Sequence, residues 1–397
     1  MVSRLTTALL LGSSAWALPF GGIWERQNTS TCTLQNSYAA VDYAKLPDPF
    51  TFADGRKVAT QADWKCRVAE ISKLMQQFEL GDYPPPPDKV VATLSGSTMS
   101  VAVTVGSKSV TISTTIKKAS TSPGPAIITI GGSSLPIPGT IGTIAFNNDN
   151  FASQASGSSR GQGAFYTLFG NTHSAGALTA WAWGVDRVVD GLEQLGADKT
   201  GIDTKRLGTT GCSRNGKGAF IVGALVNRIA LTLPQESGSG GAACWRISDS
   251  QHSAGANIQT ASEIVGENVW FSKNLNTYAT KTNTMPEDHH MLAALIAPRG
   301  LFVIENDIDW LGPVSTTGCM KAGRLIYKGV GAPNNMGFSL VGGHSHCQFP
   351  SAQQADLTTY MNYFLLASTT APGSIEKSSA TVAVTDWAPW TVPTLTA

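Results

Sequence analysis

The stretch TTGCSRNGKGAF, from Thr209 to Phe220, decides the fold of this chain. Ser213 stands among small residues, after a β-prone segment and before an apolar segment that suits a helix. A sharp strand-to-helix turn that presents a serine has this layout, and glycines recur there because side chains would clash. The pattern G-x-S-x-G would place a second glycine where Asn215 stands, but Gly216 comes one place late. The stretch predicts either a nucleophile on a strained turn or an ordinary serine in a glycine-rich loop.

Predicted strands and helices alternate on both sides of this stretch. Short apolar runs predict strands at residues 126–130, 206–210, 229–233 and 300–305, and apolar or amphipathic segments predict helices at 176–195, 218–225 and 352–367. Residues 99–116 alternate around a Gly-Ser-Lys-Ser turn, which predicts an antiparallel hairpin. We therefore expect an α/β fold, a three-layer αβα sandwich around a mainly parallel, twisted sheet. Residues 18–397 contain no repeat or linker and are expected to form one catalytic domain, although the tail after Ala371 fits no element.

The charge balance excludes some partners, and the first residues predict export. The chain has 28 basic and 27 acidic residues, a balance that offers no electrostatic surface for nucleic acid or an anionic membrane. Residues 1–17 carry Arg4, a short apolar run and a small-x-small triplet, the layout of a secretory signal peptide. No later stretch is apolar enough to span a bilayer. We expect a soluble, secreted monomer, and the sequon at Asn28 is a candidate glycosylation site.

Export also favours disulfides for the six cysteines, whose spacings resemble no zinc motif. Cys212 directly precedes Ser213, and Cys347 directly follows His346. If the serine and the histidine lie within hydrogen-bonding reach, their neighbours approach the separation that a disulfide requires. We therefore predict a Cys212–Cys347 bridge, and local pairing leaves Cys32–Cys66 and Cys244–Cys319.

A nucleophilic serine needs a histidine base that a carboxylate orients. In α/β hydrolases the chain order is serine, acid, histidine, and the histidine precedes the final helix. The segment VGGHSHCQF (341–349) lies there and offers His344 and His346, of which the predicted disulfide favours His346. The acid remains open between Glu236, after the strand at 229–233, and Asp307 or Asp309, after the strand at 300–305. Pattern alone prefers Asp307 or Asp309.

Three motifs in this order resemble the fungal glucuronoyl esterases. They are GCSRNGKG (211–218), LPQESGSGG (233–241) and GGHSHC (342–347), and the similarity extends through nearly the whole mature chain, including the segment WAWGVDR (181–187). The resemblance implies an α/β-hydrolase fold and an esterase that cleaves the bond between 4-O-methyl-glucuronic acid of glucuronoxylan and lignin alcohols. It implies no metal or organic cofactor. The late glycine of the serine motif is the family's own variant.

The resemblance also assigns roles to individual residues. It implies Ser213 as nucleophile, His346 as base, Glu236 as acid in place of Asp307 or Asp309, and Arg214 at the oxyanion. On the sugar side it implies Lys217, Gln259, Glu267 and Trp310. Lys217 lies four residues after Ser213, on the same helix face, and its ammonium can donate to sugar hydroxyls. Taken without the resemblance, Trp310 reads as a core aromatic, and Gln259 and Glu267 read as surface polar residues.

Three alternative functions compete with this interpretation. A metallohydrolase would use His344 with His346, or His289 with His290, but the sequence has no HExxH-like spacing. A non-catalytic carbohydrate-binding protein on a hydrolase scaffold would lack a triad member, and all three are present. Within the esterases, a feruloyl or acetyl-xylan esterase is the main alternative, because a triad alone does not name its acyl group.

Overall fold

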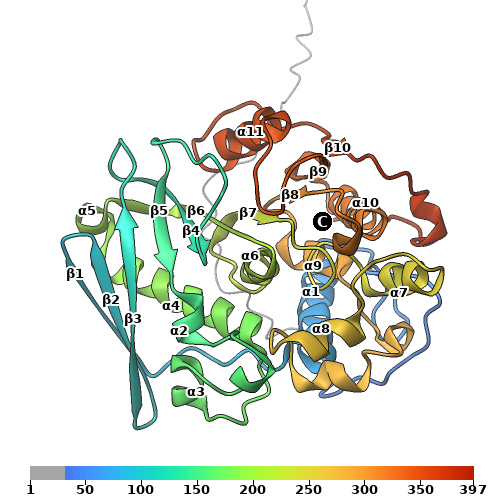
Figure 1. Ribbon diagram of the computed structural model, residues 1–397, viewed down its shortest axis with the longest axis horizontal. Coiled ribbons are helices and arrows are strands. Elements are labelled where there is room, and N and C mark those ends of the chain that lie inside the picture. The colour runs from blue at the N-terminus through green and yellow to red at the C-terminus, as the bar shows by residue number, and fades with distance from the viewer. Residues whose placement is uncertain (1–31) are drawn as a thin grey trace, which may run out of the picture.

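The computed structural model describes residues 32–397 (Figure 1). The predicted signal peptide and the Asn28 sequon lie outside these residues. The described chain contains three disulfides, which join the expected pairs Cys32–Cys66, Cys212–Cys347 and Cys244–Cys319. No helix in residues 32–397 is long and apolar enough to cross a membrane.

A ten-stranded sheet forms the middle of the described chain, in the order β1-β2-β3-β5-β4-β6-β7-β8-β9-β10. Pairing is antiparallel from β1 to β5 and parallel from β5 to β10, as the mainly parallel prediction requires. The strands are β1 (Lys89–Ser95), β2 (Thr98–Val105), β3 (Lys108–Lys117), β4 (Gly124–Ile130), β5 (Gly142–Phe146), β6 (Ile202–Cys212), β7 (Ile229–Gln235), β8 (Gly300–Glu305), β9 (Met336–Leu340) and β10 (Glu376–Lys377). The expected hairpin is β2 and β3.

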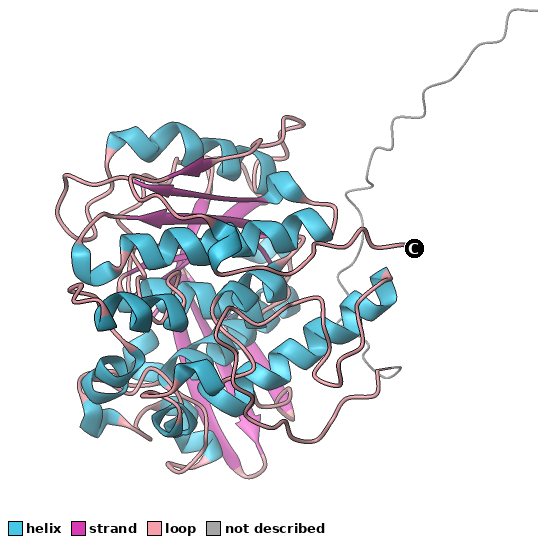
Figure 2. Cartoon of the chain, turned by 90° about the vertical axis from the view of Figure 1, so that its right-hand side faces the viewer, coloured by secondary structure: helices cyan, strands magenta, loops and turns pink. Residues whose placement is uncertain are grey.

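Helices cover both faces of the parallel strands, which confirms the αβα sandwich. One side holds α1 (Gln61–Met75), α4 (Ala177–Leu195), α6 (Arg214–Leu225), α9 (His290–Ile296) and α10 (Pro313–Gly329), and the other holds α11 (Gln354–Phe364). Figure 1 shows α11 across β7–β9 from α6, α9 and α10, and Figure 2 shows helices lying over the strands. Successive side chains of a strand point to opposite faces. Accordingly, Leu301 and Val303 join the large core, whereas Phe302 and Ile304 pack with α11.

The tail that the sequence left unassigned folds back onto the domain. β10 pairs in parallel with β9, so it extends the sheet by one short strand. Thr396 forms a bridge with Thr60 at the start of α1, and Trp390 packs edge-on against Phe50. These contacts join positions far apart in the chain, and local periodicity carries no information about such contacts.

Candidate active site

Ser213 lies on the sharp turn between β6 and α6. Its backbone angles are φ 61° and ψ −127°, a conformation that costs free energy for a residue with a side chain. A Cβ atom at Gly211 would lie 2.4 Å from the Asn215 carbonyl oxygen, and one at Gly216 would lie 2.3 Å from the Gln235 carbonyl oxygen. Both positions therefore need glycine, because helix α6 approaches β6 and β7 so closely.

Asn215, at the position where G-x-S-x-G has glycine, is held by buried amides. Its Oδ1 accepts hydrogen bonds from Asn148 Nδ2 and Gln154 Nε2, each at 3.1 Å. A Cβ atom at Gly131, just after β4, would lie 2.2 Å from the Asn215 amide nitrogen. The asparagine thus ties the serine turn to the neighbouring loops, and the glycine needed for close packing falls one place later.

His346 meets Glu236 across the carboxyl edge of the sheet. His346 Nδ1 lies 2.8 Å from Glu236 Oε2, and the Cys347 amide donates to the same oxygen at 2.8 Å. The Glu236 side chain is 1% exposed. With its proton on Nδ1, the imidazole presents the lone pair of Nε2, and this buried nitrogen has no hydrogen-bond partner within residues 32–397. A base oriented in this way can take a proton from a serine hydroxyl.

The disulfide brings this histidine to the serine turn. A ring nitrogen of His346 and the sulfur atoms of Cys212 and Cys347 lie within 4.8 Å of one another. The two sulfurs are bonded to each other at 2.02 Å, so they are not thiolates that could hold an ion. The bridge therefore connects the residue before Ser213 to the residue after His346.

Backbone strain concentrates at the same place. Within residues 32–397, the non-glycine residues with positive φ are Ser213 (61°), Glu236 (45°), Cys347 (64°) and Ala367 (57°). Ser213 is in the serine turn, Glu236 is the candidate acid, and Cys347 lies in the segment 341–349, which we call the histidine loop. Such conformations cluster at active sites, where the surrounding structure holds them in place.

The other candidates for base and acid take different places. His344 Nε2 lies 2.8 Å from the Val341 carbonyl oxygen, and Asn306 Nδ2 lies 3.2 Å from His344 Nδ1, so protein groups occupy both ring nitrogens. Asp307 and Asp309 are exposed. The structure thus places Glu236 against His346, contrary to the preference from pattern alone. The reason is that the chain turns back directly after Glu236 and buries this carboxylate under the histidine loop.

The residues expected on the sugar side gather around this centre. The Trp310 ring packs edge-on against His346, with 4.8 Å between ring centroids. The Gln259 amide donates to the Trp310 carbonyl oxygen at 3.3 Å, and Gln259 Nε2 donates to Glu267 Oε2 at 3.1 Å. Gln259 and Trp310 are half-buried and Glu267 is exposed, so all three reach solvent, and Trp310 does so beside His346.

Lys217 is buried on the first turn of α6, where its pKa is unusual. Its ammonium donates to the Ser237 carbonyl oxygen at 2.5 Å. Burial lowers the pKa of Lys217 to about 8, and the carboxylates of Glu305 and Glu267 oppose part of that shift. Lys217, whose amide is hydrogen-bonded to Ser213, therefore loses its proton at a lower pH than an exposed lysine does.

Two supporting residues escaped the sequence reasoning. Trp270 is buried, with the Arg214 guanidinium 5.5 Å and the Lys217 ammonium 5.8 Å from its ring centroid, within the range of cation–π attraction. Its Nε1 donates to Gln154 Oε1 at 2.8 Å. Glu305 ends β8 and accepts hydrogen bonds from the loop that carries Glu236. The run ENVW around Trp270 has no periodic pattern, and Glu305 follows an apolar strand, so neither gives a local signal.

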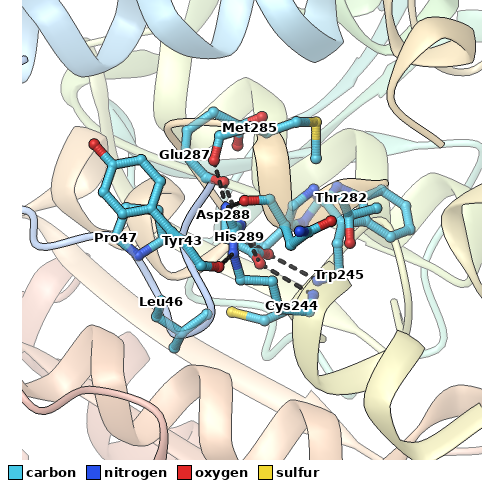
Figure 3. Close-up of polar contacts among 12 residues, drawn as sticks. Tyr43, Leu46, Pro47, Cys244, Trp245, Thr282, Met285, Glu287, Asp288 and His289 are labelled. Carbon is cyan, nitrogen blue, oxygen red and sulfur yellow. Dashed lines mark hydrogen bonds and ion pairs between the residues drawn. The ribbon is translucent and has the colours of Figure 1, made fainter. Parts of the chain in front are cut away.

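His289 and His290, the other pair considered as metal ligands, are buried in a separate polar cluster. Both ring nitrogens of His289 face acceptors, Glu79 Oε1 at 2.8 Å and the Gly241 carbonyl oxygen at 2.6 Å. His290 Nε2 lies 2.9 Å from the Pro47 carbonyl oxygen. Figure 3 shows this cluster, in which Asp288 accepts from the Trp245 amide at the start of α7 (Trp245–Ser253). Its histidines are bound by protein groups and support the fold.

Comparison with known proteins finds similar chains over nearly the whole length. A family model described as glucuronyl esterase, fungi, matches residues 101–331. The 4-O-methyl-glucuronoyl methylesterase of Neurospora crassa is 64% identical over 396 residues, which are 99% of this chain and 99% of that protein. The enzyme of the same name from Thermothelomyces thermophilus is 63% identical over 390 residues, 98% of each chain.

A solved structure shows the same fold. It is a serine-to-alanine mutant of the glucuronoyl esterase from Sporotrichum thermophile, in complex with methyl 4-O-methyl-β-D-glucopyranuronate. It superposes with a TM-score of 0.90 at 64% identity and covers 92% of this chain and 99% of that chain. The chain therefore belongs to the family of fungal glucuronoyl esterases.

Proposed function

We propose that this protein is a secreted serine esterase that hydrolyses the ester between 4-O-methyl-D-glucuronic acid of glucuronoxylan and lignin alcohols. The observation that carries the proposal is the contact between His346 Nδ1 and Glu236 Oε2, 2.8 Å apart, with the disulfide linking the histidine loop to the turn of Ser213. The names of the relatives, and the methyl glucuronate ester in the Sporotrichum complex, support the acyl group. Lignin as the alcohol, a monomeric state and one catalytic domain over residues 18–397 are parts of the same proposal.

In the proposed reaction, Ser213 Oγ attacks the uronate carbonyl carbon and His346 Nε2 takes the hydroxyl proton. Glu236 holds the imidazole in the tautomer that leaves Nε2 free and stabilises the imidazolium that forms. Arg214 and backbone N–H groups stabilise the developing oxyanion, at roughly 3–4 kcal/mol for each well-placed donor. His346 then protonates the leaving alcohol. Water, deprotonated by the same nitrogen, releases the glucuronate and restores Ser213.

The chemistry of the four residues expected on the sugar side supports a uronic acid in the acyl site. Lys217 would donate to a ring hydroxyl and Glu267 would accept from one, while Gln259 does both. Trp310 offers an apolar ring with a single N–H for the methoxy side. A feruloyl group would need an extended aromatic slot, and an acetyl group would offer these polar side chains no hydroxyl to bind. A non-catalytic sugar-binding protein would have no use for the strained Ser213 turn.

Two assays test the proposal. We expect hydrolysis of methyl or benzyl glucuronate esters to exceed that of methyl galacturonate, ferulate and acetate esters, and Ser213→Ala to abolish turnover while sugar binding remains. A preference for ferulate or acetate esters would identify the protein as a feruloyl or acetyl-xylan esterase instead. Full turnover by Ser213→Ala would exclude the serine mechanism, and sugar binding without turnover in the natural protein would support the binding-protein alternative.

A further inference from the structure

The backbone just after Glu236 is bound to the end of β8 by successive amides. We call residues 236–242 the acid loop. The Glu236 amide donates to the Ile304 carbonyl oxygen at 2.7 Å. The next two amides, of Ser237 and Gly238, both donate to Glu305 Oε1, at 2.8 and 3.3 Å. Consecutive N–H groups around left-handed residues form a concave anion site, and here a side chain of the same chain fills it.

Glu305 also fixes the side chain inside the acid loop. The Ser237 hydroxyl donates to Glu305 Oε1 at 2.9 Å, and its oxygen accepts from the Ala242 amide at 3.0 Å. Glu305 is 1% exposed, and within residues 32–397 its Oε2 is buried without a hydrogen-bond partner. One carboxylate oxygen thus holds three donors of the acid loop, while the other oxygen makes no hydrogen bond to the rest of the fold.

Lys217 and Glu305 bind opposite ends of the peptide group between Ser237 and Gly238. Glu305 accepts from the Gly238 N–H at 3.3 Å, and the Lys217 ammonium donates to the Ser237 carbonyl oxygen at 2.5 Å. Glu236 immediately precedes Ser237 and has a φ of 45°. Its conformation therefore depends on the orientation of the two peptide groups that follow it, which Glu305 and Lys217 bind. Neither Glu305 nor Lys217 contacts the Glu236 carboxylate through a hydrogen bond. The hydrogen bonds by which they hold Glu236 therefore act through the backbone, while the Glu236 and Glu305 carboxylates also repel each other.

We propose that Glu305 is a positioning residue, which holds Glu236 in its left-handed turn by binding the Ser237 and Gly238 amides. Lys217 completes the arrangement from the carbonyl side, so one lysine connects the acid loop to α6, the helix that begins directly after Ser213. The inference rests on the proposed role of Glu236 as the acid. It adds a second, non-reacting carboxylate whose task is geometric: Glu305 sets where Glu236 meets His346 Nδ1.

The test compares four variants by kcat and KM for benzyl glucuronate, with active sites counted by a serine-directed phosphonate. Glu305→Ala removes the acceptor, and we expect kcat per titrated site to fall roughly 10- to 100-fold, more than KM changes. Glu305→Gln keeps an acceptor oxygen and should stay within about threefold. Glu305→Asp withdraws the carboxylate by one methylene, and its kcat per titrated site should fall about tenfold. This variant still tests the proposal if the alanine variant does not fold.

The matched control is Glu287→Gln. Glu287 is another buried carboxylate, in the cluster of Figure 3, whose oxygens have no hydrogen-bond partner in residues 32–397. It makes no hydrogen bond to the acid loop, and its variant should keep kcat within about twofold. If Glu305→Ala or Glu305→Asp keeps full kcat per titrated site, or if Glu305→Gln loses as much as Glu305→Ala, the positioning role is wrong.

A double-mutant cycle separates this inference from the proposed triad. In a Glu236→Ala background, Glu305→Ala should cost less than about twofold, because there is no acid left to position. Full additivity of the two losses would overturn positioning and leave the triad intact. Unchanged activity of Glu236→Ala alone would overturn the assignment of the acid, and the role of Glu305 with it.

Discussion

Ser213 and Glu236 occupy matching places on neighbouring strands, each one residue beyond the register pair of Cys212 on β6 and Gln235 on β7. The Ser213 amide donates to the Gln235 carbonyl oxygen at 3.0 Å, which binds the serine turn directly to the strand that carries the acid. Parallel strands end at the same edge of a sheet, where α/β proteins place their sites. Because Ser213 and Glu236 lie side by side, the histidine loop can approach both residues at once. The Cys212–Cys347 disulfide holds the loop in that position.

Two histidines in one loop should respond very differently to replacement. His346→Ala removes the proposed base, and we expect kcat/KM to fall by about 10³-fold or more. His344→Ala removes a ring that binds Val341 and Asn306, and we expect less than a tenfold loss. Kinetics with benzyl glucuronate and circular dichroism of both variants check this. Equal losses of kcat/KM would mean that activity depends on the conformation of the loop and not on the imidazole of His346.

Removing the active-site disulfide should lower both stability and turnover. The bridge joins residues 135 positions apart, and loss of such a link costs roughly 2–5 kcal/mol of unfolding free energy. Cys212→Ala with Cys347→Ala should therefore unfold at lower urea concentration and show a reduced kcat. Cys32→Ala with Cys66→Ala is the matched control, expected to lose stability with kcat intact. Unchanged kcat in the first pair would show that the bridge does not hold the histidine loop in place.

The glycine at position 216 should be irreplaceable. In Gly216→Ala the new methyl group would lie 2.3 Å from the Gln235 carbonyl oxygen, so α6 must move away from β7. We expect a loss of roughly 2–4 kcal/mol in unfolding free energy, measured by urea titration, with the serine turn displaced. Gly139→Ala, whose Cβ would meet nothing within 4 Å, should change stability by less than about 1 kcal/mol. Similar values for the two variants would contradict the packing argument.

Sugar binding should weaken as the solution becomes alkaline. Burial lowers the pKa of Lys217 to about 8, so its ammonium is lost as the pH rises through that value. In a Ser213→Ala background, we expect the Kd for methyl 4-O-methyl-glucuronate, measured by calorimetry, to rise about tenfold between pH 6.5 and 9. Adding Lys217→Met should give weak binding that no longer changes with pH. The same pH dependence in both proteins would assign the effect to another group.

Glu305 should make the fold less stable as the pH rises from acid to neutral. Burial raises the pKa of Glu305 to about 7, from an ordinary value of 4.5. Between these values the folded chain keeps a proton that the unfolded chain has released, so this contribution is complete below 4.5 and is lost by about pH 7. Glu305→Gln removes the effect. Its stability relative to the natural protein should rise by up to roughly 3 kcal/mol between pH 4.5 and 8 in urea titrations, and a constant difference would contradict the shift.

Local sequence patterns were sufficient for the parts of this protein that neighbouring residues control. The strand at Gly300–Glu305 has the predicted bounds, and α4 begins one residue after the predicted start. Strand β6 continues to Cys212, and α6 begins at Arg214, four residues before the predicted start at residue 218. The reason is that the chain bends at Ser213 itself. Strands β1, β5 and β9 and helices α1 and α10 were not predicted.

Neighbouring residues along the chain were enough to predict the strand–turn–helix around Ser213, the alternation of strands and helices, and the disulfide that links the serine to the histidine loop. These follow from spacing along the chain and from the reach of a disulfide. Spacing alone left the acid open between Glu236, Asp307 and Asp309, and the resemblance implied Glu236; the tertiary structure brings Glu236 to His346 and places the Ser237–Gly238 peptide group between Glu305 and Lys217. The reason is physical: the register of parallel strands and the turn after each strand bring together groups up to 110 residues apart, which local periodicity does not record.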